Sequence, residues 1–391
     1  ESLKIKKENI IFKINCDTES GLGHLIRCVR IANNLKKKYK LFFLIDYLKK
    51  NNELENYLKN INVLSIYKNN QVFVNQKDDY LKFRKLTKKI KSDTIIIDDY
   101  RLSSIWHKKL RKYYKKIIII DDLANRKFFG DYYINYKNTD TKLLKSRLVK
   151  KCNKGMKFLL GPKYCILDKN LITQRSKKFG IMINFGNAFD FKKLVKLIYF
   201  FEKDIFFKNI NIYICIGYFS KNFKYILKLK NKNFKIIFKK IFIENYLKKI
   251  NLFIGSSGQS IYDMSYLNIP SIFFSTKKNQ SNFLKDMMSL GHYFVFNNNE
   301  YSKIKVLKLI KVLILNYKKT RENILVFNDT LSYPLKILEA VLLITTQSSV
   351  FISEADLDLD FCFSSSDSYS FSLKLKFFSF KINDVKSTGK P

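Results

Sequence analysis

Short runs of apolar residues alternate along the first half of the chain with lysine-rich stretches whose apolar residues recur at helical spacing. Several runs are apolar at every position and end in aspartate, as in Ile95-Ile96-Ile97-Asp98-Asp99 and in residues 117–122. Such runs are typical of parallel strands that are covered on both faces, so they predict an α/β fold. The expected strands are 10–14, 41–45, 62–65, 94–97, 117–120 and 131–134.

The same pattern restarts at residues 180–186, after a break at Gly161-Pro162. It predicts further strands at 210–216, 235–238, 252–254 and 271–274, and a closing helix at 302–317. Two α/β units of similar size therefore follow one another. We expect an N-terminal Rossmann-like domain at 1–168 and a C-terminal Rossmann-like domain at 169–340, facing each other across a cleft.

The composition of the chain changes after Lys336, because residues 337–373 contain no lysine or arginine. Two interpretations stay open for the tail at 341–391. It is the start of a truncated third domain, or a stretch with an altered reading frame that is disordered. We assign it no chemistry.

A glycine loop, Gly21-Leu22-Gly23-His24, lies between the first expected strand and a helical pattern, and Arg27 follows one helical turn later. Strand, glycine turn and helix in this order direct backbone N–H groups and a helix N-terminus at a bound anion. A histidine at that place can act as a general base, and Asp17 lies just before the loop. The alternative is that His24 only caps the helix.

A second loop of small residues, 255–260 (Gly-Ser-Ser-Gly-Gln-Ser), follows the strand expected at 252–254. It predicts another anion site between a strand and a helix, with Asp263 in that helix. Such a loop also occurs for purely structural reasons, and Asn279-Gln280 downstream favours the functional interpretation.

Few other side chains offer proton transfer or metal binding. His107 follows Trp106 in a lysine-rich helical pattern, which predicts a solvated side chain, and His292 follows Gly291 in an expected turn. The six cysteines form no C-x-x-C pair, so we expect buried free thiols and no metal site.

The formal net charge is +41 at pH 7, which raises the possibility of nucleic-acid binding. The lysines are scattered over every segment, and residues encoded by A/T-rich codons are abundant throughout. Both features favour a biased composition, with a general attraction to anionic ligands as its by-product.

The loop with Asp17 and Gly-x-Gly-His-x-x-Arg resembles the start of the PseG-like UDP-sugar hydrolases of pseudaminic acid biosynthesis. That family is similar to spore-coat polysaccharide proteins and, more distantly, to MurG-type glycosyltransferases. The resemblance continues in order through Trp106 and in the segments 97–100 (Ile-Asp-Asp-Tyr), 120–126 (Ile-Asp-Asp-Leu-Ala-Asn-Arg) and 159–164 (Leu-Leu-Gly-Pro-Lys-Tyr). It covers roughly residues 9 to 300.

The resemblance implies a GT-B-like fold and metal-independent cleavage of UDP-2,4-diacetamido-2,4,6-trideoxy-β-L-altropyranose to UDP and the free sugar. His24 would activate the attacking water, and no cofactor would be needed. It implies further that Asp263 holds the ribose, that the loop amides hold the pyrophosphate, and that Asn279 and Gln280 reach phosphate or sugar. The substrate-binding residues expected in all are Asp17, Gly21, Gly23, Arg27, Tyr100, Gly186, Ser256, Ser257, Gly258, Asp263, Asn279 and Gln280.

The sequence departs from the family pattern at three places. Asn15 stands where an arginine is common, Asn187 where a second glycine is usual, and Asp263 where many relatives carry glutamate. Two other functions therefore stay open. One is a GT-B glycosyltransferase that uses a UDP-sugar donor, and the more remote one is a basic nucleic-acid-binding protein.

The chain does not begin with Met, shows no signal peptide and has no run of about 18 apolar residues that could span a membrane. The last two features predict a cytoplasmic protein without a membrane span. For the N-terminus two interpretations stay open: the chain is a fragment, or it continues a longer polypeptide whose first domain is missing. A fusion or association with other enzymes of the nonulosonate pathway stays open together with the N-terminus. The expected partner is a UDP-sugar and not a nucleic acid.

Overall fold

The computed structural model describes residues 7–17, 21–46, 52–67, 71–137, 140–168, 171, 178–186, 191–217, 223–227, 229, 232–240, 243–274, 291–295 and 303–322. The chain divides into two compact units, 1–343 and 344–391. The second unit lies wholly outside the described residues, and so does the tail predicted at 341–391. The boundary expected near residue 168 stays a prediction.

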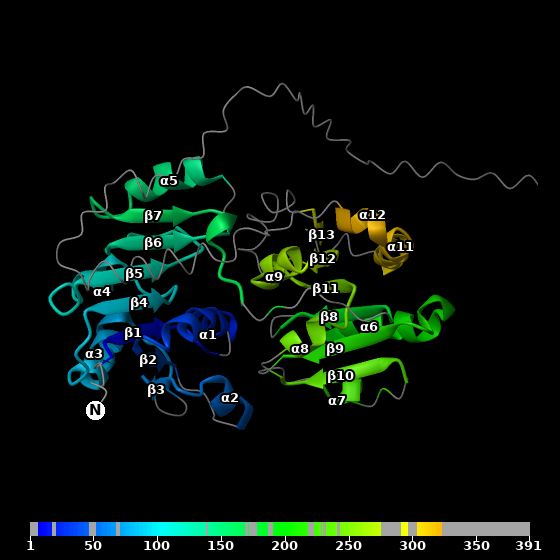
Figure 1. Cartoon of the computed structure of the whole chain (residues 1–391), viewed down its shortest axis with the longest axis horizontal. Helices are drawn as coiled ribbons and strands as arrows, with labels where there is room; N and C mark the ends of the chain where they lie inside the picture. Colours follow the sequence, from blue (N-terminus) through cyan, green and yellow to red (C-terminus); the bar gives the residue numbers. More distant parts are fainter. Residues whose placement is uncertain are drawn as a thin grey trace, which may run out of the picture. The chain divides into compact units, whose positions relative to one another are not determined.

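The first sheet of unit 1–343 is parallel and has the strand order β3-β2-β1-β4-β5-β6-β7 (Figure 1). Its strands are β1 (Asn9–Ile14), β2 (Lys40–Ile45), β3 (Asn62–Ser65), β4 (Thr94–Asp98), β5 (Lys116–Ile120), β6 (Tyr132–Asn135) and β7 (Lys157–Leu160). The helices between them are α1 (Gly23–Leu35), α2 (Asn52–Tyr57), α3 (Gln76–Thr87), α4 (Ser104–Lys108) and α5 (Thr141–Val149).

The second sheet is also parallel and has the order β10-β9-β8-β11-β12-β13. Its strands are β8 (Gly180–Asn184), β9 (Asn211–Ile216), β10 (Phe234–Phe238), β11 (Leu252–Ser256), β12 (Ser271–Phe274) and β13 (Tyr293–Val295). The helices of this half are α6 (Phe191–Lys203), α7 (Lys224–Leu227), α8 (Glu244–Leu247), α9 (Ser260–Tyr266), α11 (Lys303–Leu315) and α12 (Tyr317–Glu322).

Both sheets contain the strand order 3-2-1-4-5-6 of a doubly wound fold, when the strands of each sheet are numbered from its own first strand. In this order successive strands are added on one side of the first strand and then on its other side, which defines a reversal point beside that strand. In the first sheet β1 pairs with both β2 and β4, and in the second β8 pairs with both β9 and β11. Open α/β sheets bind ligands outside the carboxyl ends of these central strands. The two reversal points therefore define where a ligand site is expected.

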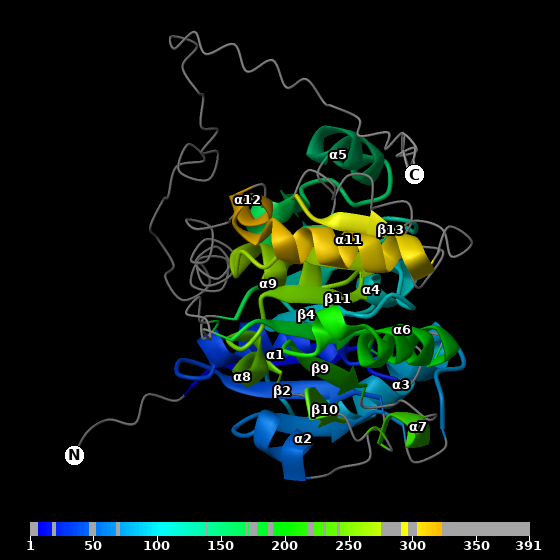
Figure 2. The same cartoon turned by 90° about the vertical axis from the view of Figure 1, so that its right-hand side faces the viewer.

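Successive residues of each strand pack on opposite faces of the sheet, as the pleat requires. Ile10 and Phe12 of β1 share a core with α1, whereas Ile11 packs in the core that contains Trp106 of α4. In the second half, α6 and α11 share a core with β8 and β11 (Figure 2). Helices thus cover both faces, which explains why the strands are apolar at nearly every position.

The predicted α/β class and the expected strands of both halves are confirmed. Two strands were not predicted, β7 and β13, and each lies at the edge of its sheet. An edge strand is short and pairs on one side only, so its apolar signal is weak. The helix expected at 302–317 ends at Leu315, and α12 begins at Tyr317.

The solvated position predicted for His107 is wrong, because the side chain is fully buried. It stacks on Phe128, and neither ring nitrogen has a hydrogen-bond partner among the described residues. Burial lowers the pKa of His107 from 6.5 to about 3, and it does the same for His292, which is also buried. The charged residues around His107 misled the sequence interpretation, since only the tertiary packing covers its ring.

We expect His107→Leu to reduce the acid sensitivity of folding. Between pH 6.5 and about 3 the unfolded chain binds a proton at His107 that the folded protein excludes, so the free energy of unfolding falls as the pH falls. From pH 7 to pH 5 the free energy of unfolding of the wild type should fall by roughly 2 kcal/mol more than that of the variant. Urea titrations at the two pH values measure this, and equal losses in both proteins would contradict it.

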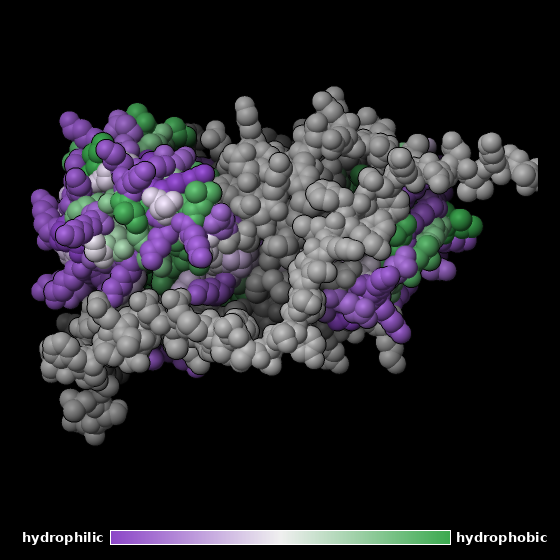
Figure 3. Space-filling view, turned by 90° about the horizontal axis from the view of Figure 1, so that it is seen from above, coloured by the Kyte–Doolittle hydropathy of each residue, from purple (hydrophilic) through white to green (hydrophobic). Residues whose placement is uncertain are grey.

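Hydrophilic residues cover most of the coloured surface in the face seen in Figure 3, with hydrophobic residues in small groups among them. Among the described residues, every helix falls short of the length and apolar character that a membrane crossing requires.

Candidate active site

The first glycine loop follows β1 and leads into α1. Gly21 has φ +78°, a left-handed conformation that glycine adopts without strain, and its N–H donates to the carbonyl of Asp17 at 2.9 Å. A Cβ built on Gly23 would meet no atom within 4 Å. The loop therefore turns tightly and leaves open space beside the start of α1, at the reversal point of the first sheet.

His24, the second residue of α1, is held by the carboxylate that ends β4. Its Nδ1 lies 2.5 Å from Oδ1 of Asp98, and the exposed fraction of the whole residue is 7%. Burial by itself raises the pKa of Asp98, but the charges of Arg27 and His24 and their hydrogen bonds outweigh it and lower this pKa. An ionised carboxylate only accepts hydrogen bonds, so Nδ1 carries a hydrogen, and in the neutral form of this ring the lone pair is on Nε2.

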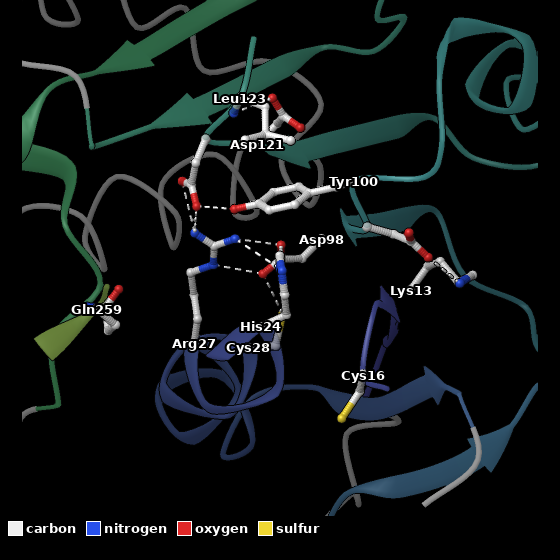
Figure 4. Close-up of polar contacts among 12 residues, drawn as sticks. Lys13, Cys16, His24, Arg27, Cys28, Asp98, Tyr100, Asp121, Leu123 and Gln259 are labelled. Carbon is white, nitrogen blue, oxygen red and sulfur yellow. Dashed lines mark hydrogen bonds and ion pairs between the residues drawn. The ribbon is translucent and has the colours of Figure 1, made fainter. Parts of the chain in front are cut away.

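Arg27 lies one turn after His24 and fixes the position of Asp98. Its Nε and Nη2 donate to the two oxygens of Asp98 at 2.8 and 2.6 Å. Its Nη1 donates to Asp122 at 3.0 and 3.1 Å and to the hydroxyl of Tyr136 at 2.8 Å. Figure 4 shows the guanidinium between these carboxylates. Since Arg27 is 3% exposed, a buried cation joins the ends of two strands.

Tyr100 borders the imidazole. Its ring packs edge-to-face on His24, with 4.4 Å between the ring centres, and its hydroxyl donates to Asp122. Asp122 also accepts from Lys137 at 2.8 Å. Burial raises the pKa of Asp122, but Arg27 and Lys137 hold it well below its ordinary range. Asp122 is therefore an anion that positions both Tyr100 and Arg27.

The remaining aspartates at the two strand ends also have cationic partners. Asp99 lies 2.6 Å from the buried ammonium of Lys13 and 2.7 Å from Arg101, and Asp121 lies 2.6 Å from Arg126. In the described ranges, no three His, Cys, Asp or Glu side chains form a group that could hold a metal ion. Each of these carboxylates is thus paired with a cationic side chain.

Asp17, predicted to bind substrate, lies 3.4 Å from Arg101 and has a side chain that is 33% exposed. Arg101 also contacts Asp46, at 3.1 Å from each carboxylate oxygen. The structure thus brings Asp17 to the same edge of the sheet as His24. Its role in binding stays a prediction.

The second predicted loop lies at the reversal point of the second sheet, after β11. The N–H of Ser257 donates to the carbonyl of Phe274 at 3.1 Å, and a Cβ on Gly258 would meet no atom within 4 Å. Gly186, at the carboxyl end of the neighbouring β8, has φ +60° and the same open space. Ser256 ends β11 beside them. The ligand roles of these residues stay predictions.

Asp263 in α9 is 7% exposed and forms a two-pronged ion pair with Arg30 of α1, at 2.8 and 3.0 Å. Burial raises the pKa of Asp263, against the opposing charge of Arg30. The carboxylate that was predicted to hold a ribose is therefore already engaged, and its predicted role is untested. Asn279 and Gln280 lie outside the described residues.

Sequence reasoning missed several residues of this network, namely Arg30, Arg101, Tyr136 and Gln259. Arg30 follows Arg27 by three residues, and Tyr136 directly follows Asn135 at the end of β6. Helical spacing and the position after a strand were the available signals. Neither signal says which partner such a side chain meets.

No family model matches the chain. It is 26% identical over 277 residues to an uncharacterised protein of Methanocaldococcus jannaschii, a match that covers 65% of this chain and 53% of that protein. It is 24% identical over 284 residues to the Helicobacter pylori protein named pseudaminic acid cytidylyltransferase and UDP-2,4-diacetamido-2,4,6-trideoxy-beta-L-altropyranose hydrolase, over 71% of this chain and 47% of that one. The chain spans about half the length of these curated relatives.

Solved structures match over both sheets. The spinosyn rhamnosyltransferase SpnG superimposes with a TM-score of 0.58 at 8% identity, covering 85% of this chain and all of that one. The UDP-GlcNAc 2-epimerase of Neisseria meningitidis gives 0.57 at 11% identity, covering 86% and 100%. Identity this low shows the fold alone. The chain therefore has the two-sheet α/β fold of the GT-B type.

Proposed function

We propose that the chain is an enzyme that acts on nucleotide sugars and that hydrolyses a UDP-linked diacetamido-trideoxy sugar to UDP and the free sugar. The observation that carries this proposal is the His24–Asp98 pair at the reversal point of the first sheet. A histidine whose Nδ1–H is held by a carboxylate presents a basic Nε2, which is the arrangement of a general base.

In the proposed reaction, the oxygen of a water molecule attacks the anomeric carbon. The bond from that carbon to the oxygen of UDP breaks, and UDP leaves with the electron pair. The proton of the water passes to Nε2 of His24. Attack opposite the leaving group inverts the anomeric centre.

Residues 255–258 of the second loop (255–260) are proposed to receive the diphosphate. Backbone N–H groups of such a loop, which leads into the N-terminus of α9, stabilise negative charge that grows as UDP departs. The open space beside Gly258 and Gly186 supports this assignment, because a phosphate can approach the backbone closely there.

The identity of the sugar is supported by the resemblance of the loop motifs and by the activity for which the Helicobacter pylori relative is named. A place in nonulosonate biosynthesis follows from the same likeness. UDP as the nucleotide is also consistent with the bound UDP-GlcNAc named for the Neisseria meningitidis structure.

A glycosyltransferase that passes the sugar to an acceptor is the second candidate. Its support is that the rhamnosyltransferase SpnG has the same fold. The same imidazole would then deprotonate an acceptor hydroxyl in place of water. The fold does not separate the two reactions.

Turnover without an acceptor distinguishes the candidates. We expect the purified chain to convert the UDP-linked diacetamido-trideoxy sugar to equal amounts of UDP and free sugar, with an inverted anomer as the first product in the NMR spectrum. Release of UDP that begins only when an acceptor is added would show a transferase. A protein that releases no UDP under either condition would contradict both.

A further inference from the structure

Tyr136, which directly follows β6, has a hydroxyl group with two partners from different parts of the chain. It accepts from Nη1 of Arg27 at 2.8 Å and donates to Oε1 of Gln259 at 2.7 Å. The residue is completely buried, and its ring packs edge-to-face on Tyr262 with 5.3 Å between the centres. Its carbonyl accepts from the hydroxyl of Tyr262 at 3.0 Å. Packing therefore holds the hydroxyl between Arg27 and Gln259.

Gln259 directly follows residues 255–258, which are proposed to bind the diphosphate, within the same loop, and it precedes the first residue of α9. Its Nε2 donates to the carbonyl of Ile166 at 2.8 Å, while its Oε1 accepts from Tyr136. Both ends of the amide are thus engaged. A movement of the loop would move the oxygen that Tyr136 bonds.

On the other side of Tyr136, Arg27 leads to the imidazole. Oδ1 of Asp98 accepts from both Arg27 Nη2, at 2.6 Å, and His24 Nδ1, at 2.5 Å. The continuous contacts therefore run as follows: Gln259 to Tyr136, Tyr136 to Arg27, Arg27 to Asp98, and Asp98 to His24. Figure 4 shows Gln259 on the other side of Arg27 from Asp98 and His24.

We infer that Tyr136 is a positioning residue that couples the diphosphate loop at 255–258 to the orientation of His24. The inference rests on the proposed function, since it gives that loop its ligand. Binding of the nucleotide fixes the position of Gln259. The hydrogen bonds of the Tyr136 hydroxyl to Gln259 and Arg27 then fix the position of Arg27, which orients Asp98 and the imidazole. The site thus becomes competent for water activation when the diphosphate is in place.

Tyr136→Phe removes only the hydroxyl group and keeps the ring against Arg27 and Tyr262. We expect kcat to fall about 10- to 100-fold with little change in KM, because the lost bond joins a charged group and acts after binding. The matched control is Tyr133→Phe, in β6 three residues earlier, whose buried hydroxyl donates to Asp121 at 2.9 Å. This control should keep the kcat and the KM of the wild type.

The direct test uses UDP alone as the probe and NMR of protein labelled with carbon-13 at histidine Cε1. The chain has three histidines, and the His24 signal is the one absent from His24→Gln. UDP should shift this signal in the wild type and in Tyr133→Phe. In Tyr136→Phe the shift should be lost, although UDP still binds with a Kd within about threefold of the wild type by calorimetry.

The outcomes separate the inference from the function on which it rests. Equal shifts in the wild type and Tyr136→Phe, or an unmoved His24 signal in a wild type that binds UDP, would overturn the coupling and leave the nucleotide site intact. A wild type that does not bind UDP would overturn the proposed function, and the coupling with it.

Discussion

Replacing His24 by glutamine is expected to lower the rate of UDP release from the UDP-linked sugar by about 10²- to 10⁴-fold. Glutamine keeps a polar side chain at the start of α1 but cannot take up a proton from water. The loss should lie in kcat, since the loops that are proposed to bind the nucleotide are unchanged. Steady-state assays of UDP and free sugar give both parameters.

His107→Gln is the matched control for that experiment. It also removes a buried histidine, but one that packs in the core on the face of the first sheet opposite α1. Its turnover should stay within about threefold of the wild type once folding has been checked. A His24→Gln protein that kept more than about a tenth of the wild-type rate would show that the imidazole is not the base.

Arg27→Met is expected to lower the free energy of unfolding by about 3–5 kcal/mol. The arginine neutralises Asp98 and Asp122, and both carboxylates are nearly or completely buried. Methionine fills a similar volume but leaves two buried anions close together. Catalysis should be lost as well, because Asp98 is no longer held against His24.

The difference in the free energy of unfolding between the wild type and Arg27→Met should become smaller as the pH falls. In the wild type the pKa values of Asp98 and Asp122 lie below the ordinary 3.8, so their contribution to stability is present above that value and is lost only in stronger acid. Without the arginine, burial raises both pKa values, and protonation relieves the repulsion at mildly acidic pH. Urea titrations at pH 8 and pH 5 measure the difference.

Arg111→Met supplies the control for Arg27. Arg111 also pairs with a carboxylate, since its Nη2 donates to both oxygens of Asp131 at 2.9 Å, but both side chains are 35% exposed. Solvent screens that pair, so its loss should cost at most about 1 kcal/mol. Equal destabilisation by the two substitutions would mean that burial of the Arg27 network is not what makes it important.

Burial also explains why the position of His107 was predicted wrongly, whereas a local signal marks His24 as a site candidate. The glycine loop marks His24, since tight turns before a helix need residues such as Gly21. For His107 the only local signal was the surrounding charge. Phe128, which covers its ring, lies 21 positions further along the chain (128 − 107 = 21), and no periodic pattern records that contact.

No local sequence pattern could predict which residues of the candidate site contact one another either. Asp98 meets His24 across 74 positions because β1 pairs with β4 and skips the strands between. Arg30 meets Asp263 across 233 positions, and no local pattern predicted this ion pair.

By itself, the sequence determined the α/β class, the position of most strands and the two glycine loops, because these depend on side-chain periodicity and on backbone freedom at single positions. Only the tertiary structure decided which charges meet. Parallel pairing brings together strand ends that are far apart in the chain, and burial then requires every carboxylate that gathers there to find a cation.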